Sequence, residues 1–141
     1  MSGITPALAG ELLKLLFNGT PIANIADNAA SSPLTTWVLS LHTAKPTTGQ
    51  DHNEVTYTGY GRIALDRNSG DFVVTGDSMS PVADILFGTC TAGVMSATYL
   101  GIGTAHTGAG SLKFAFALSP AISIFPGQVP RIKNTSVVSM G

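Results

Sequence analysis

Large apolar residues recur at every second position in several parts of the chain, which is the pattern of β-strands that bury one face. Residues 37–42 show this alternation, and residues 112–118 show it most clearly, with leucine or phenylalanine at each even position. Pro120 is expected to break this strand before another begins at 122. With similar segments between glycine- and proline-rich turns, we predict about eight strands in a mainly β fold, an antiparallel β-sandwich or jelly-roll-like barrel.

A single helix is predicted over residues 5–17. Thr5 can cap it, Pro6 suits the first helical position, and Asn18-Gly19 supplies the stop. One stripe at helical spacing is made of Leu8, Leu12, Leu15 and Leu16. A helix of about 13 residues is marginal alone, so it either covers an open end of the sandwich or docks on a neighbouring subunit.

Two irregular segments flank the first strand. Residues 20–35 are short apolar pairs broken by polar residues and proline, and they are interpreted as an extended arm with Ile22 and Ile25 as anchors. The arm either reaches another subunit or packs on its own domain. Residues 44–60 form a long polar loop, and such loops are usually functional or covered by a partner. We predict one β-sandwich domain over 1–141, in which residues 1–35 form the helix and arm.

Charged residues are scarce in this chain. They make up 11% of its 141 residues, against about 25% in ordinary soluble domains. The net charge of −1 argues against a nucleic-acid partner, which would require a basic surface. Mean hydropathy is +0.31, yet no apolar run reaches the roughly 18 residues of a membrane helix, so we predict no membrane partner. A neutral surface protects a monomer poorly against association, which predicts an assembly component.

Residues that could carry chemistry are scattered. The three histidines are isolated from one another in sequence, and no Cys/His cluster has metal-ligand spacing. Asp51, His52 and Glu54 crowd one loop, where a solvated loop is the simpler interpretation than a site. Cys90, the single cysteine, is interpreted as a small buried hydrophobe. We therefore predict no enzyme, and no catalytic, cofactor-binding or metal-binding residue.

Four motifs occur in a characteristic order along the chain. They are Leu-His-Thr-Ala-Lys-Pro at 41–46, Asn-Glu-Val at 53–55, Tyr-Thr-Gly-Tyr-Gly-Arg at 57–62 and Gly-Ile-Gly-Thr-Ala-His-Thr-Gly at 101–108. This ordered set resembles a family of small virion proteins of tailed bacteriophages, whose members are labelled tail-fibre-like or capsid decoration proteins. The resemblance implies a virion structural protein, assembled in the cytoplasm of the bacterial host.

Three functional hypotheses follow from the resemblance and the low charge. The first is a capsid decoration (cement) protein, a homotrimer that binds the major capsid protein and stabilises the shell through subunit interfaces. The alternative is a tail, baseplate or tail-fibre-associated structural protein. A third, a carbohydrate-binding β-sandwich, would need a platform of exposed aromatic residues.

A partner interface is predicted at residues from the helix, the arm and the polar loop. These residues are Leu8, Leu12, Leu15, Ile22, Ile25, Pro46, Tyr57 and Tyr60.

Overall fold

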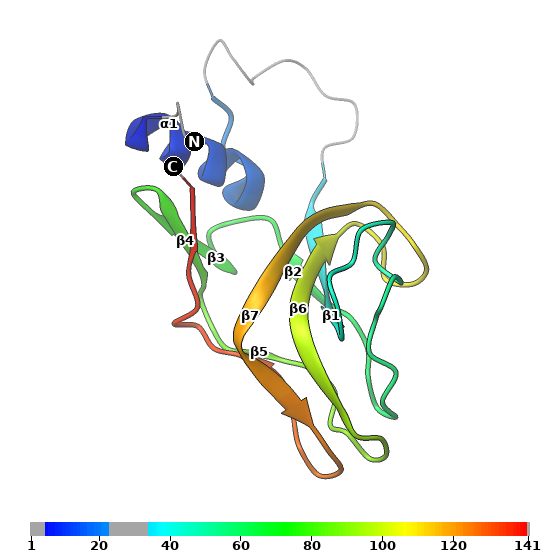
Figure 1. Ribbon diagram of the computed structural model, residues 1–141. Helices are drawn as coiled ribbons and strands as arrows, with labels where there is room; N and C mark the ends of the chain where they lie inside the picture. Colours follow the sequence, from blue (N-terminus) through cyan, green and yellow to red (C-terminus); the bar gives the residue numbers. More distant parts are fainter. Residues whose placement is uncertain (1–4, 23–33, 141) are drawn as a thin grey trace. The chain divides into compact units, whose positions relative to one another are not determined.

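The computed structural model describes residues 5–22 and 34–140 (Figure 1). Its helical segment is α1 (Pro6–Leu13), continued by the π-helical turn η1 (Lys14–Asn18). The described strands are β1 (Thr36–His42), β2 (Ile63–Asp66), β3 (Phe72–Thr75), β4 (Ser78–Pro81), β5 (Ile85–Leu86), β6 (Met95–Gly103), β7 (Leu112–Ile124), β8 (Arg131–Ile132) and β9 (Val138–Ser139). The predicted class is confirmed: the fold is mainly β, with antiparallel strand pairs and one short N-terminal helix.

The chain packs as two compact units, and the single β-sandwich domain over 1–141 stays a prediction. The sheet unit comprises residues 36–65 and 85–132. The helix unit comprises residues 1–35, 66–84 and 133–141. The N-terminal helix therefore shares its unit with strands that come much later in the chain.

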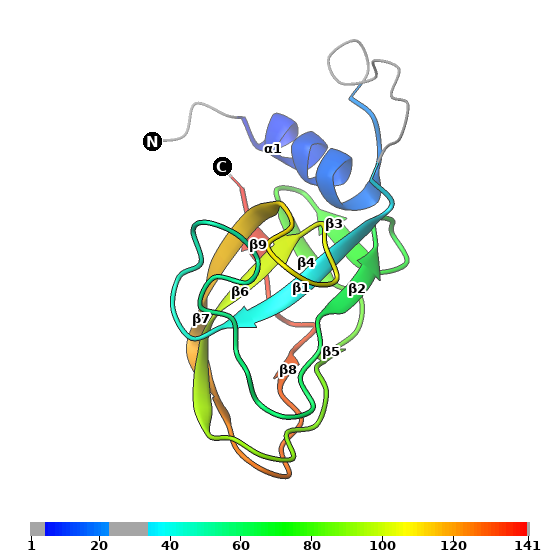
Figure 2. The ribbon, with the colours of Figure 1, turned by 90° about the vertical axis from the view of Figure 1, so that its right-hand side faces the viewer.

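The sheet unit is built on a four-stranded sheet with the order β2-β1-β6-β7 (Figure 2). Register places Leu39 opposite Ile102, which in turn lies opposite Phe114. A second row of the same kind runs from Leu41 through Leu100 to Phe116. Because side chains two positions apart share a face of a sheet, these rows form one apolar face, and Leu39, Leu41 and Ile102 are buried.

Strand β7 does not end at Pro120, so the predicted break is wrong. The strand continues to Ile124. Between the pairs Tyr99–Ala117 and Ala97–Ile122, β6 advances by two residues while β7 advances by five. Pro120 lies in this bulge, where its missing N–H removes no hydrogen bond of the ladder, and bulges and edges are the places in sheets that tolerate proline.

The helix has the ends that its sequence predicts but buries a different face. The Thr5 hydroxyl accepts a hydrogen bond from the Leu8 N–H at 3.3 Å, and Gly19 ends the segment in the left-handed conformation, with φ of 67°. The fully buried side chains belong to Ala9, Leu13 and Phe17. The leucines of the predicted stripe, Leu8, Leu12, Leu15 and Leu16, are only half-buried.

The reason for this choice of face is a close approach between the helix and the β3–β4 turn. A Cβ atom at Gly10 would lie 2.4 Å from the carbonyl oxygen of Gly76, so only glycine fits there. The Phe17 ring packs on Phe72 of β3 at a centroid distance of 5.1 Å. Small residues beside Leu13 therefore let the helix approach the hairpin, and the bulkier leucine stripe is turned away. No helix in the described part of the chain is long and apolar enough to cross a membrane.

Arg67 caps the carboxyl end of the helical segment. Its Nε donates to the carbonyl oxygen of Leu16 at 2.9 Å, and its Nη2 donates to that of Leu15. Its Nη1 donates to the carbonyl oxygen of Leu34, also at 2.9 Å. The last carbonyls of a helix lack partners within the helix and carry partial negative charge, so a guanidinium there both satisfies and neutralises them.

We expect Leu13→Ala to lower the free energy of unfolding of the helix unit by about 2–5 kcal/mol, because it removes a fully buried side chain. The matched variant Leu12→Ala, at a half-buried position of the same helix, should cost less than half as much. Urea unfolding followed by circular dichroism measures both. Equal losses would contradict the assignment of the buried face.

Candidate functional site

The long polar loop between β1 and β2, residues 43–62, is fixed to its own sheet by a buried glutamine. Gln50 is fully buried; its Nε2 donates to the carbonyl oxygen of Val38 at 3.1 Å, and its Oε1 accepts from the N–H of Ala105 at 2.9 Å. Its backbone N–H donates to the carbonyl oxygen of Ala109 at 2.7 Å. One side chain thus joins this loop to β1 and to the β6–β7 loop.

Glycines on β6 make room for this packing. A Cβ at Gly103 would lie 2.3 Å from Cδ of Gln50, and a Cβ at Gly101 would lie 2.6 Å from Nε2 of His42. Both distances are shorter than atoms can approach, so the side chains of the loop and of β1 occupy the space that other residues would need on β6. This accounts for Gly101 and Gly103 of the 101–108 motif.

His42 and Ser40 form a buried polar pair on β1. Ser40 Oγ lies 2.8 Å from His42 Nε2, and His42 Nδ1 lies 2.8 Å from the carbonyl oxygen of His52. Since a carbonyl can only accept, Nδ1 carries the proton and Nε2 accepts from the serine hydroxyl. Burial lowers the pKa of His42 below its usual 6.5, against the opposing effects of the His52 carbonyl and the Glu54 charge.

This serine–histidine pair has the spacing of a nucleophile and its base, but it has no room for a substrate. Both side chains are 0% exposed. Gly101 stands directly against Ser40 Oγ, since a Cβ there would lie 2.8 Å from that atom. The pair therefore joins the loop to the sheet inside the unit.

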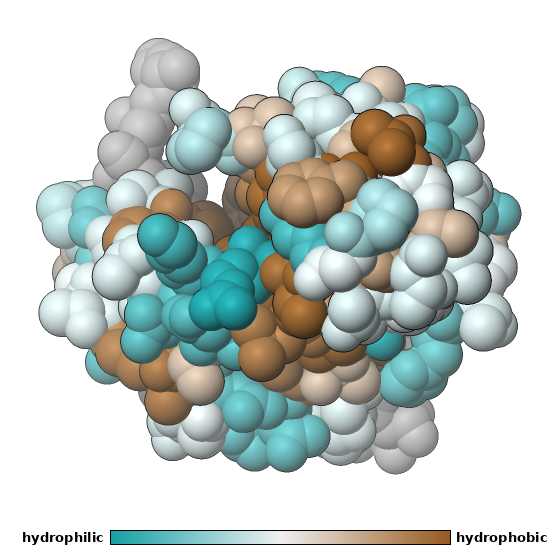
Figure 3. All heavy atoms as spheres, turned by 90° about the horizontal axis from the view of Figure 1, so that it is seen from below, coloured by the Kyte–Doolittle hydropathy of each residue, from teal (hydrophilic) through white to brown (hydrophobic). Residues whose placement is uncertain are grey.

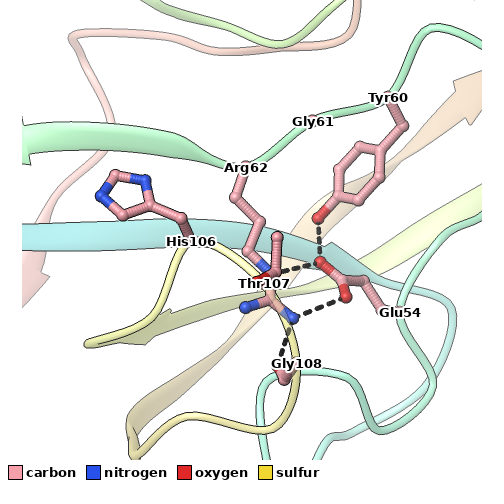
Figure 4. A pocket seen from close by; sticks show the side chains of 7 residues that line it. All are labelled: Glu54, Tyr60, Gly61, Arg62, His106, Thr107 and Gly108. Carbon is pink, nitrogen blue, oxygen red and sulfur yellow. Dashed lines mark hydrogen bonds and ion pairs between the residues drawn. The ribbon is translucent and has the colours of Figure 1, made fainter.

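A second polar cluster joins Glu54, Tyr60 and Arg62 of the same loop (Figure 4). Arg62 Nε and Nη2 donate to the two carboxylate oxygens of Glu54 at 2.8 and 2.9 Å, and the Tyr60 hydroxyl also donates to Glu54. The Arg62 side chain is 4% exposed and that of Glu54 15%. This two-point geometry is the strongest form of an arginine–carboxylate pair.

The pKa values of Arg62 and Tyr60 are both raised. The hydrogen bond and charge of Glu54 raise the pKa of Arg62, although burial opposes them. Burial, and then the hydrogen bond to Glu54, raise the pKa of Tyr60. Both side chains therefore keep their protons at any ordinary pH and remain hydrogen-bond donors to Glu54.

Arg62 extends the cluster to the β6–β7 loop. Its Nη1 donates to the carbonyl oxygen of Ala105 at 2.8 Å and its Nη2 to that of Gly108 at 2.6 Å. Tyr57 fixes the other side of the polar loop, since its hydroxyl donates to the carbonyl oxygen of Gly88 at 2.7 Å. Burial raises the pKa of this hydroxyl to about 12. Motif residues that are distant in sequence thus meet in one network.

A hollow of about 270 Å³ opens beside this network. It is lined by Glu54, Tyr60, Gly61, Arg62, His106, Thr107 and Gly108. The charges of Glu54 and Arg62 are directed at each other, and the His106 ring is directed away from the Glu54 carboxylate (Figure 4). No three potential metal ligands gather anywhere in residues 5–22 and 34–140. The arrangement stabilises two loops and presents no set of converging reactive groups.

Comparison with known protein families identifies the class of protein to which this chain belongs. Residues 3–139 match the family described as podophage GP4 fiber I protein gp80. The chain belongs to this family. No curated protein matches it. Membership of this phage fibre family confirms the resemblance to small virion proteins and makes the chain a structural protein of the phage particle.

The residues predicted to form a partner interface in this member of the fibre family come from both units. Pro46 and Tyr57 are buried in the sheet unit, so they pack the loop and offer a partner almost no surface. Tyr60 is half-buried and holds Glu54. Ile22 is 6% exposed, and Ile25 lies outside the described residues. Leu8, Leu12 and Leu15 keep partly exposed side chains on the helix, and for them the interface stays a prediction.

Sequence reasoning missed the roles of Gln50, Ser40 and His42 in this fibre-family chain. The crowding of acidic and histidine residues at 51–54 did signal the region, but Glu54 pairs with Arg62 and does not form a site with Asp51. The useful signal was the pair of glycines at 101 and 103. Small residues at alternate positions of a strand indicate that another segment approaches the strand backbone closely on that face.

We expect Arg62→Met to lower the free energy of unfolding of the sheet unit by on the order of 3 kcal/mol, since it leaves a mostly buried carboxylate without its partner. Urea unfolding followed by the fluorescence of Trp37, the single tryptophan, reports on this unit. Lys45→Met removes an exposed cation from the same loop and should change stability by less than about 0.5 kcal/mol. A similar loss in both variants would refute the proposed role of the ion pair.

His42 predicts a pH dependence of stability. Because its folded pKa lies below 6.5, the unfolded chain binds more protons in the window between the two values. The free energy of unfolding should therefore fall as pH decreases from 6.5 toward the folded pKa, by at most about 1.4 kcal/mol per pH unit.

The variant His42→Asn, whose amide can still donate to the His52 carbonyl, should flatten this slope in unfolding curves measured from pH 7.5 to 5. His106→Asn, at an exposed position, controls for the loss of one histidine. An unchanged slope in His42→Asn would show that other groups cause the dependence.

Proposed function

We propose that this chain is a non-enzymatic component of a phage tail fibre or of its attachment to the tail. The observation that carries the proposal is the family match over residues 3–139, because the family is described as a fibre protein. The expectation from sequence ranked capsid decoration first and a tail-fibre-associated protein second. The family description favours this alternative.

The internal network fits a mechanical role. Gln50 and His42 fix the long loop to β1, and Arg62 fixes it to the β6–β7 loop. A loop held by buried hydrogen bonds loses little further conformational entropy when a neighbour packs on it. A rigid surface of this kind suits a protein that holds its neighbours at fixed positions along a fibre.

The surface also fits a component that is covered by neighbours. Only 11% of residues are charged, and Figure 3 shows apolar and weakly polar residues interspersed with smaller strongly hydrophilic groups on one face. A carbohydrate-binding platform has less support, because Phe125 is the one aromatic side chain of residues 5–22 and 34–140 that is largely exposed. We propose other virion proteins and further copies of this chain as its partners.

Location on the virion tests this function. Gold-labelled antibodies against the chain should mark the tail of purified virions in negative-stain electron microscopy. Quantitative mass spectrometry should give far fewer copies than of the major capsid protein. Labelling over the whole shell, with a copy number close to that of the major capsid protein, would instead establish capsid decoration and overturn the fibre proposal.

A further inference from the structure

The polar loop leaves the carboxyl end of β1 (Figure 2), and its first part forms a short strap, residues 44–48. Hydrogen bonds fix the chain on both sides of this strap. The N–H of Thr43 donates to the carbonyl oxygen of Asn53 at 2.8 Å, and the N–H of Gln50 donates to that of Ala109 at 2.7 Å. Any motion of the strap is therefore confined to the residues between these two anchors.

A histidine ring holds the middle of the strap. The backbone N–H of Thr47 donates to Nδ1 of His52 at 3.1 Å, and the Thr47 hydroxyl lies 3.4 Å from the same nitrogen. Within the described part of the chain, the other hydrogen bond to the strap runs from Nδ2 of Asn53 to the carbonyl oxygen of Lys45, at 3.4 Å. Pro46 of the strap is buried, so the closed strap packs an apolar side chain against the sheet unit.

The bond to the strap requires an unprotonated Nδ1 on His52. A backbone N–H can only donate, so Nδ1 must accept, and the proton of the neutral ring lies on Nε2. His42 has the opposite tautomer, because its Nδ1 donates to the carbonyl oxygen of His52. The serine hydroxyl beside His42 can rotate toward another acceptor, whereas the Thr47 N–H is fixed by the backbone. The bond between Thr47 and His52 therefore depends on the protonation of the ring.

We propose that protonation of His52 at Nδ1 releases the strap, so that mild acid opens residues 44–48 and exposes Pro46. The imidazolium carries an N–H on both ring nitrogens, so two donors would face each other across the present bond to Thr47. The Thr47 hydroxyl can turn and accept from the imidazolium, but the backbone N–H loses its partner. Histidine is the side chain whose charge ordinarily changes between pH 5 and 8. The proposal goes beyond the proposed function and does not depend on where the chain lies in the virion.

Other ionisable groups lie in the loop itself and in the segments hydrogen-bonded to its first part. They are Lys45, Asp51, Glu54, Tyr57, Tyr60 and Arg62 of the loop, His42 of β1, Tyr99 of β6 and His106 of the β6–β7 loop. The Glu54 and Arg62 charges are paired with each other. Burial raises the pKa of both Tyr57 and Tyr60. The two other histidines are the groups of the same chemical type as His52, so the test must separate all three.

Amide hydrogen exchange measured by NMR reports the opening of the strap. Between pH 7.5 and 5, the protection of the Thr47 N–H, relative to the intrinsic exchange rate at each pH, should fall roughly three- to tenfold, as expected for one ordinary hydrogen bond. The N–H of Gln50 is bonded to a carbonyl, which does not titrate, and should keep its protection. Nitrogen-15 shifts of the imidazoles follow each histidine separately, and the change at Thr47 should share the midpoint of His52.

Nuclear Overhauser effects between Pro46 and the rest of the sheet unit should weaken over the same pH range. Unchanged contacts of Pro46 would overturn the release of the strap, even if the bond to Thr47 were lost.

Three variants assign the effect to one ring. His52→Asn places an amide oxygen, which does not titrate, near the position of Nδ1, and the pH dependence of Thr47 protection should vanish. His42→Asn and His106→Asn each remove a different histidine and should open like the wild type. Thermal melting confirms that each variant folds. Thr47 protection that is independent of pH in the wild type, or that falls equally in His52→Asn, would contradict the proposal.

Discussion

The sheet unit depends on the close approach of polar side chains to strand positions that have no side chain. Gln50 and His42 fill the space beside Gly103 and Gly101. Because these side chains are fully buried, each must find hydrogen-bond partners inside the unit, and those partners come from β1, the polar loop and the β6–β7 loop. The requirement for buried polar groups to be satisfied therefore fixes three segments at once.

Residues of the four sequence motifs contact one another in this arrangement. His42 of the first motif donates to the carbonyl just before the second, and Glu54 of the second accepts from Arg62 of the third. Arg62 in turn reaches the carbonyls of Ala105 and Gly108 in the fourth. In this member of the fibre family, the motif residues determine how the loops are held on the sheet. The fixed loops give the sheet unit a defined surface that neighbouring proteins in the virion can contact.

Local sequence patterns predicted the strands and the helix ends. They failed where contacts with segments distant in the sequence determine which side chains are buried. The alternation in residues 37–42 correctly predicts β1. The same pattern predicts that Ser40 and His42 face solvent, because no nearby residue indicates that residues 43–62 will cover them. The helix cap at Thr5 needs only its own neighbours, whereas the buried face depends on Gly10 meeting Gly76. Pro120 is tolerated for a similar reason, since the bulge that accepts it is a property of the pairing with β6.

The division of the chain between its units also sets an order of events during synthesis. The helix unit draws on segments that both precede and follow most of the sheet unit in the chain, and its strand β9 pairs with β4. Domains fold as the ribosome releases them, so β4 lacks this partner until translation has passed Ser139. During that interval the segments that form the contact between Phe17 and Phe72 have already been synthesised, so the N-terminal helical segment can cover this side of the β3–β4 hairpin while the nascent chain is still attached.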